Sequence, residues 1–229
     1  MFIGHYAPAF AAAALATGDE KGAVSTVGLG TMFIAAQLID YAFFGFALAG
    51  IENMRISPGM SMMNPMDLYD IPYSHSLLGT FGFAFGFGLL VMLASGNRRA
   101  ALAGALVVIS HWFLDLLVHV PDLTLFGSEP KLGLGLWNHP LIEMPLELIL
   151  CFGAFYWYLR ATRPKPVNSQ VRRAWLAPLV LALVLLAVQL YNWFGPQPES
   201  YGPSIAWTAL VAFTILALLA HWAARQRTA

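Results

Sequence analysis

Charged side chains are scarce in this sequence of 229 residues. Asp, Glu, Lys and Arg together make up only 10% of it, whereas 59% of the residues are hydrophobic and the net charge is zero. An ordinary soluble domain has about 25% charged residues, so the composition excludes that class and predicts a polytopic membrane protein. Cysteine is nearly absent as well. Cys151 stands alone, which excludes a disulfide within the chain and leaves the redox compartment open.

Two further features are missing. No basic region precedes the first apolar segment, so we do not expect a cleaved signal peptide. No motif typical of nucleic-acid binding is present, and the basic stretch at residues 160–173 is better explained as a segment that touches anionic lipid head groups. We therefore expect membrane lipids, and no nucleic acid, as partners.

Long apolar runs predict an all-α fold, a polytopic transmembrane bundle of six helices preceded by a short N-terminal helix. A span needs about 20 apolar residues to cross about 30 Å of hydrocarbon. Residues 2–17 would reach only about 24 Å as a helix, so this segment either spans thinly or re-enters. The six longer runs cover residues 23–51, 74–94, 100–120, 140–160, 174–194 and 204–222.

Proline, glycine and polar residues predict a polar turn at residues 18–22 and two long loops, at residues 52–73 and 121–138. Loops of this length are usually functional or disordered. The expected organisation therefore has three parts. They are a polar-site membrane domain (1–160), a basic cytoplasmic linker (161–173) and a two-helix C-terminal scaffold packed on the same bundle (174–229).

The positions of the basic residues predict the orientation in the membrane. With six helices from residue 23 onward, and with Lys21 directly before the first of them, ten of the twelve Lys and Arg residues fall on one side. Only Arg55 and Lys131 fall on the other. Because basic loops are retained in the cytoplasm, we expect the basic loops and the C-terminus to be cytoplasmic in an inner or plasma membrane. The two long loops and the helix ends next to them would then face the extracytoplasmic side.

The apolar run at residues 100–120 and the residues just after it carry a polar stripe. Its members are His111, Asp115, His119 and Asp122, which share one helical face because successive residues turn by about 100°. In a soluble protein such residues are usually hydrogen-bonded core groups or surface bridges. Burying a carboxylate in hydrocarbon costs several kcal/mol unless a proton, a cation or a metal compensates it. The stripe therefore favours a metal or proton-handling site.

Other ionisable residues are predicted to reach the same half of the membrane. They stand on the loops and helices that would face the stripe, and they are His5, Asp40, Asp67, Asp70, His75, His139 and Glu143. Imidazoles and carboxylates form a nitrogen and oxygen ligand set that suits zinc, manganese or a similar divalent ion. We expect one polar cavity, open toward the extracytoplasmic face, with one or two such ions per chain.

Four short motifs carry a resemblance to a known family. They are Gly4-His5, Leu38-Ile39-Asp40, Ser74-His75-Ser76 and Ser110-His111-Trp112-Phe113-Leu114-Asp115, in this order within about the first 125 residues. Together they resemble the membrane-bound metal-dependent hydrolases, which include the LexA-binding, inner-membrane-associated hydrolases. The chain departs from the family in two places. Leu38 replaces the first acid of an Asp-Ile-Asp block, and Asp70-Ile71-Pro72 replaces a His-Arg-Gly sequence.

The resemblance implies an integral membrane hydrolase that acts on a lipid or lipid-linked ester or phosphoester through a metal-activated water. The metal ligands that it implies are His5, Asp40, Asp70, His75, His111 and Asp115. Asp122 or Glu143 is then left free to act as a general base. His119, His139 and Glu147 are expected to line the cavity. A lipid-like small molecule is the expected substrate, and a second copy of the chain is a further candidate partner.

Three other functions stay open on the sequence. A proton- or ion-coupled transporter also carries intramembrane Asp and His residues, although the inner halves of the helices supply few polar groups and no inverted repeat is found. A haem-binding electron carrier would use histidines as axial ligands, but the neighbouring carboxylates disfavour it. A non-catalytic assembly subunit would use buried polar groups only to hold helices together.

Overall fold

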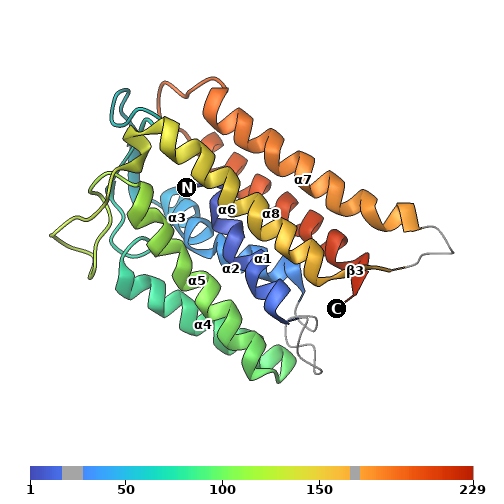
Figure 1. The fold of residues 1–229 in the computed structure, drawn as a ribbon. Helices are drawn as coiled ribbons and strands as arrows, with labels where there is room; N and C mark the ends of the chain where they lie inside the picture. The colour runs from blue at the N-terminus through green and yellow to red at the C-terminus, as the bar shows by residue number, and fades with distance from the viewer. Residues whose placement is uncertain (17–27, 166–170, 229) are drawn as a thin grey trace.

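The computed structural model describes residues 1–16, 28–165 and 171–228, and helices predominate there (Figure 1). The long helices are α4 (Leu77–Ser95), α5 (Arg98–Val118), α6 (Pro140–Ala161), α7 (Val171–Phe194) and α8 (Pro203–Arg225). All five are long and apolar enough to cross a membrane. The predicted all-α transmembrane bundle is therefore confirmed. The polar turn expected at residues 18–22 lies outside the described residues, as does part of the linker expected at 161–173.

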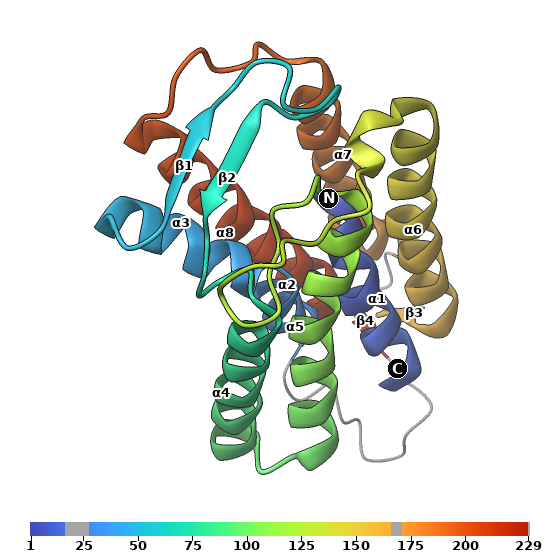
Figure 2. The ribbon, with the colours of Figure 1, turned by 90° about the vertical axis from the view of Figure 1, so that its left-hand side faces the viewer.

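Local sequence signals set the ends of α4 and α5. The side chain of Ser76 accepts a hydrogen bond from the backbone N–H of Gly79 at the start of α4, and Asn97 caps α5 in the same way. Such caps satisfy N–H groups that have no partner inside the helix. Between the two helices Gly96 adopts a left-handed conformation, with φ of 65°, that ends α4. The two helices therefore run antiparallel, side by side (Figures 1 and 2).

The helix expected over residues 23–51 is broken within its described part. Helix α2 (Leu29–Ala36) and helix α3 (Leu38–Ala49) meet at Gln37 with a bend of 54°. Gln37 is fully buried and its Nε2 donates to the carbonyl of Phe2, while the carbonyl of Ala36 accepts from Nδ1 of His111. Sharp kinks arise where other groups enter the helical hydrogen-bond ladder, which explains the difference from the expectation. Counted as one span, the pair is the sixth candidate membrane helix.

The N-terminal segment lies inside the bundle. The 3-10 helix η1 (Ile3–His5) leads into α1 (Tyr6–Leu15), which packs against α2, α5 and α6 (Figure 2). Tyr6 and Phe10 are fully buried there. Ten helical residues extend about 15 Å, roughly half of the hydrocarbon thickness. The segment thus carries His5 into the interior of the bundle.

Residues 52–73, expected to be a loop, contain a β-hairpin. Strand β1 (Asn53–Ile56) pairs antiparallel with β2 (Met66–Asp70), and Nε of Arg55 lies 2.6 Å from Oδ2 of Asp67. Pro58, Gly59 and Pro65, which indicated a loop, lie between the two strands. The second predicted loop, residues 121–138, is irregular apart from η3 (Leu136–Asn138) and lies beside the hairpin, where Nζ of Lys131 donates to the carbonyl of Tyr69. Both segments cover the same end of the bundle (Figure 1).

A small set of contacts closes the opposite end. Strand β3 (Arg163–Pro164) pairs with β4 (Arg227–Thr228), and the Arg227 guanidinium lies 4.7 Å from the ring centre of Trp175. Arg227 also donates to the carbonyls of Leu159 and Thr162. These contacts join the ends of α6, α7 and α8. Further along, a Cβ on Gly30 would lie 2.7 Å from the carbonyl oxygen of Ala217, so α2 and α8 pack with their backbones in close approach.

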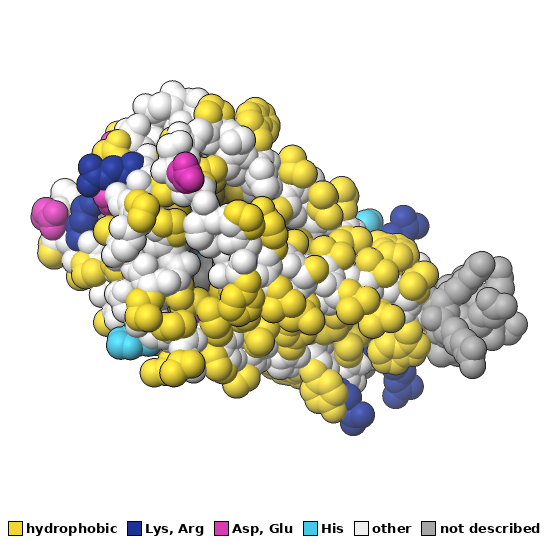
Figure 3. Space-filling view, turned by 90° about the horizontal axis from the view of Figure 1, so that it is seen from above, with side chains coloured by type: hydrophobic (Ala, Val, Ile, Leu, Met, Phe, Trp, Pro, Cys, Tyr) yellow, Lys and Arg dark blue, Asp and Glu magenta, His cyan; other side chains and the backbone are white. Residues whose placement is uncertain are grey.

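The outer surface of the bundle is apolar. Large hydrophobic side chains such as Phe85, Leu93 and Leu141 are exposed along the long helices, and Lys, Arg, Asp and Glu gather at the two ends (Figure 3). A water-soluble monomer rarely exposes apolar patches of this extent. The surface is that of a membrane protein whose sides face hydrocarbon.

Candidate metal centre

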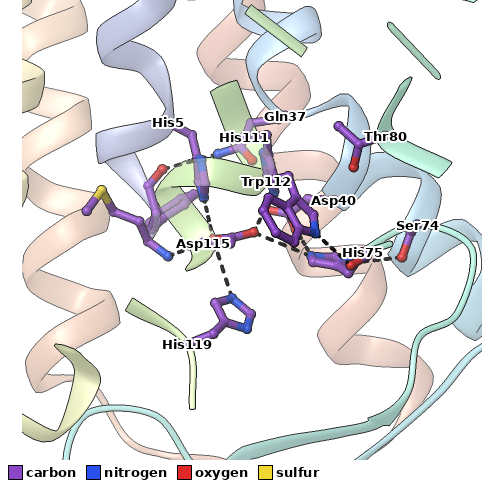
Figure 4. A network of polar contacts seen from close by, with 12 residues as sticks. His5, Gln37, Asp40, Ser74, His75, Thr80, His111, Trp112, Asp115 and His119 are labelled. Carbon is purple, nitrogen blue, oxygen red and sulfur yellow. Dashed lines mark hydrogen bonds and ion pairs between the residues drawn. The ribbon is translucent and has the colours of Figure 1, made fainter. Parts of the chain in front are cut away.

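Five ionisable side chains from four segments meet inside the bundle, near the end of α5 (Figure 4). They form two overlapping groups in which the ligand atoms lie within 4.8 Å of one another: His5, His111 and Asp115, and Asp40, His75 and His111. The three histidines and Asp115 are at most 2% exposed, and the side chain of Asp40 is 19% exposed. We call these five residues the His/Asp cluster. Sequence reasoning named all five as candidate ligands.

Asp115 is the centre of the cluster. Its Oδ1 lies 3.0 Å from Nε2 of His5 and 3.3 Å from Nε2 of His119, and it also accepts from the amino group of Met1. Its Oδ2 lies 3.0 Å from Nε2 of His111 and 3.6 Å from Nε2 of His75. The i, i+4 spacing on α5 brings His111 and His119 to opposite sides of this carboxylate. One buried anion is thus surrounded by four imidazoles.

Asp40 supplies a second carboxylate because of the helix break. It stands in the first turn of α3, where the partial positive charge of the helix end favours an anion. Its Oδ1 lies 3.5 Å from Nε2 of His75 and 3.6 Å from Nε2 of His111. In a continuous helix Asp40 would not stand in a first turn. The break at Gln37 therefore creates the helix start that favours the Asp40 carboxylate.

Three of the imidazoles are held from behind by acceptors. Nδ1 of His111 bonds the carbonyl of Ala36 (2.7 Å), and Nδ1 of His119 bonds Oδ1 of Asp122 (2.9 Å). Nδ1 of His75 bonds Oγ of Ser74 (2.8 Å), whose hydroxyl donates in turn to Oε2 of Glu52 (2.6 Å).

These contacts assign the proton on each ring. A carbonyl and a carboxylate only accept, and the Ser74 hydroxyl has given its own hydrogen to Glu52, so each of the three Nδ1 atoms carries hydrogen. In a neutral imidazole the other nitrogen then keeps its lone pair. If the three rings are neutral, as metal-bound imidazoles are, their Nε2 lone pairs point at the carboxylates of Asp40 and Asp115.

Lone pairs that face carboxylate oxygens repel unless a proton or a metal cation lies between them. Nε2 of His111 is buried and has no hydrogen-bond partner among the described residues, although it lies 3.0 Å from Asp115. Histidines that bind a metal nearly always donate their other N–H to a carboxylate, a carbonyl or water, as these rings do. The donor set of imidazole nitrogen and carboxylate oxygen therefore fits a divalent cation such as zinc or manganese.

A cavity of about 640 Å³ opens onto the cluster. Its polar wall includes Asp40, His75, Asp115, His119 and Glu143. Its apolar wall includes Phe43, Phe44, Leu68, Trp137 and Phe213, with Met63 and Met66 from the hairpin. A concave, mostly apolar site with a few convergent polar groups is typical of small-molecule binding.

The chain matches no protein-family model, no curated protein and no solved structure.

The other predicted site residues lie in four different settings. Asp70 is not brought into the cluster, because it stands on β2 and its Oδ2 accepts from the amide of Asn53 (2.8 Å). Asp122 lies behind His119 rather than in the centre. Glu143 on α6 lines the cavity, is 1% exposed, and neither carboxylate oxygen has a hydrogen-bond partner within the described chain. His139, at the start of α6, is exposed.

Glu147, one turn after Glu143, has a different environment. It accepts hydrogen bonds from the backbone N–H groups of Phe2 and Gly4 and from the amide of Gln189. These three hydrogen bonds fix the N-terminal segment against α6 and α7. Two acids on one helical face therefore differ in role: Glu147 holds the N-terminal segment, and Glu143 lines the cavity.

Sequence reasoning underrated two parts of this site. His119 was expected only to line the cavity, yet its Nε2 reaches Asp115, as its i, i+4 spacing from that residue indicates. Glu52 was expected in a loop, and it holds Ser74 and the backbone N–H of Tyr73. No sequence signal joins Glu52 to His75, because the hairpin that brings them together is a long-range feature.

Proposed function

We propose that this protein is an integral membrane metal-dependent hydrolase that acts on a lipid or lipid-linked ester or phosphoester. The observation that carries the proposal is the common orientation of His75, His111 and His119, each with Nδ1 held by an acceptor and Nε2 turned toward the buried carboxylates. The four motifs that resemble the membrane-bound metal-dependent hydrolases supply the five residues of the His/Asp cluster, and these residues lie close together. This proximity supports membership of that family.

The cluster residues would hold one or two divalent ions, zinc or manganese, with His119 as a further ligand. An ion in such a site makes water acidic enough to lose a proton near neutral pH and polarises a carbonyl or phosphoryl oxygen. Glu143 is the free carboxylate that would take up a proton from water and return it to the leaving group. The apolar walls of the cavity would limit the access of bulk water, which would strengthen the charge interactions inside it.

Elemental analysis of the purified protein tests the proposal directly. We expect one to two zinc or manganese ions per chain after expression in metal-replete medium, measured by inductively coupled plasma mass spectrometry. Treatment with a strong chelator should remove the ion and the turnover of phosphoester or ester probes together, and added metal should restore both. Protein that contains no transition metal and still turns over these probes would contradict the proposal.

The contact behind His75 gives a second prediction. Replacing Ser74 by Ala removes the hydroxyl that fixes the ring through Glu52, while every ligand atom stays in place. Loss of such an outer partner costs about 10- to 100-fold in metal affinity. Competition with a fluorescent chelator measures this change. Ser110→Ala is the matched control, because the Ser110 hydroxyl donates only to the carbonyl of Val107 in its own helix. Equal affinities for the two variants would refute the role of Ser74.

We also propose the orientation in the membrane. The end with Arg98, Arg160, Arg163 and Arg225 carries most of the basic residues, and the hairpin with Arg55 covers the other. Basic residues are retained in the cytoplasm, so the His/Asp cluster, which is near the hairpin end, would open toward the extracytoplasmic face of the inner or plasma membrane.

A proton- or ion-coupled transporter is the second candidate, and the break between α2 and α3 favours it. Discontinuous membrane helices often bind ions in transporters. Against it, Phe10, Phe33, Leu181 and Leu216 pack a continuous apolar core next to the cluster. Ion flux in proteoliposomes without turnover of any ester would decide for transport.

A further inference from the structure

A second hollow adjoins the polar cavity. It is an apolar groove of about 460 Å³ between α7 and α8, lined mainly by Val184, Val188, Trp207, Val211, Ala212 and Ile215. Three residues, Val188, Thr208 and Ala212, line both the groove and the cavity. The two spaces therefore adjoin, and the small side chain of Ala212 lies at their common boundary.

The groove opens on the outer side of the bundle. The side chains of Trp207, Val211 and Ile215 are 59%, 54% and 48% exposed, and both helices are candidate membrane spans. Whatever fills the groove must therefore come from the hydrocarbon of the bilayer. At its inner end the same occupant would reach the acids and imidazoles of the cavity, so it must be apolar along its length and polar at one end.

The size of the groove selects among such occupants. The part of α8 from Trp207 to Ile215 rises about 12 Å, so a volume of 460 Å³ corresponds to a cross-section of roughly 40 Å². An α-helix with a diameter of about 10 Å needs roughly twice that area. A single hydrocarbon chain fits within this cross-section, whereas a helix of a second copy would extend beyond it.

We propose that the groove between α7 and α8 binds one acyl chain of a membrane lipid whose head group occupies the polar cavity. The lipid enters sideways from the leaflet, between the two helices, rather than from the water phase. This inference uses the proposed function only for the fate of the head group, because binding of the chain depends on the groove alone.

Replacing Ala212 by Trp tests the proposal, since it fills the junction between groove and cavity. Leu218→Trp is the matched control: Leu218 lies on the same helix, is 63% exposed and does not line the groove. Each protein is reconstituted in nanodiscs of phosphatidylethanolamine and phosphatidylglycerol, extracted and washed in detergent. Lipid that stays bound is counted by native mass spectrometry, and metal content is measured on the same samples.

We expect about one phospholipid per chain in the wild type and in Leu218→Trp, and at least a fivefold loss in Ala212→Trp with metal content unchanged. Equal retention in all three proteins would overturn the proposal. So would a photo-crosslinking residue at Val211 that joins two copies of the chain instead of a lipid. The two hypotheses fail separately, because bound lipid without any metal would refute only the hydrolase.

Discussion

Replacing Asp115 by Asn should reduce the bound metal from about one ion per chain to less than a tenth of that value. Both oxygens of Asp115 face imidazole nitrogens, Oδ1 toward His5 and His119 and Oδ2 toward His75 and His111. The change removes one of the two negative charges of the cluster and leaves only that of Asp40. The new amide group also donates to an Nε2 lone pair, which then no longer needs a cation.

The same substitution should leave the protein folded, because the amide has the shape of the carboxylate and satisfies the rings. Metal content by mass spectrometry and helicity by circular dichroism separate loss of binding from loss of fold. Asp70→Asn is the matched control, because Asp70 bonds Asn53 on the hairpin and should keep its metal at the wild-type level. Metal lost from the Asp70 variant and kept by the Asp115 variant would place the site near Asp70 instead of at the His/Asp cluster.

Glu143→Gln should lower kcat by about 100- to 10,000-fold, which is the range that a general acid or base contributes. The metal content should not change. Glu143 is buried, lines the cavity beside Asp115 and His119, and lacks a hydrogen-bond partner among the described residues. A carboxyl group in this position is free to exchange a proton with a substrate or water. Gln keeps its size and loses that capacity. Turnover of bis-p-nitrophenyl phosphate and p-nitrophenyl butyrate measures the effect.

Glu147→Gln supplies the contrast, one turn along the same helix. Its carboxylate accepts from Phe2, Gly4 and Gln189, and hydrogen bonds to charged groups are worth about 1.5–3 kcal/mol each. We therefore expect a lower unfolding temperature and a smaller loss of kcat than in Glu143→Gln. A Glu143 variant that keeps full turnover at wild-type metal content would exclude this residue from the chemistry.

The sequence predicted the helices well where hydropathy alone decides them. Residues 74–94 and 204–222 became α4 and α8 within a few residues, because length and apolarity are enough to define a span. It did not predict the break at Gln37, because that break depends on hydrogen bonds to Phe2 and His111 from distant segments. The β-hairpin escaped prediction for a similar reason, since its turn residues indicate a loop whether or not the flanking strands pair.

The candidate site shows the same division. Helical periodicity placed His111, Asp115 and His119 on one face. The predicted topology brought His5, Asp40, Asp70 and His75 to the same half of the membrane, and the resemblance then implied that these four are metal ligands. The structure places Asp70 on the hairpin instead, bonded to Asn53. Matching Asp70 to the first position of the His-Arg-Gly sequence assumes an unchanged loop. In the structure the pairing of β1 with β2, with a register shift between Asn53 and Arg55, sets the position of Asp70 opposite Asn53.

The joint between α2 and α3 has a mechanical consequence. The carbonyl of Ala36 at the joint holds the ring of His111, so the angle between the two half-helices and the direction of that ligand change together. A cation that prefers the bent arrangement would stabilise it by RT ln(1 + [L]/Kd), about 2.7 kcal/mol at a concentration of 100 Kd. Because such coupling is reciprocal, lipids or partners that straighten the joint would lower the affinity of the site for the cation. The interrupted span would then act as a hinge whose angle the bound ion fixes.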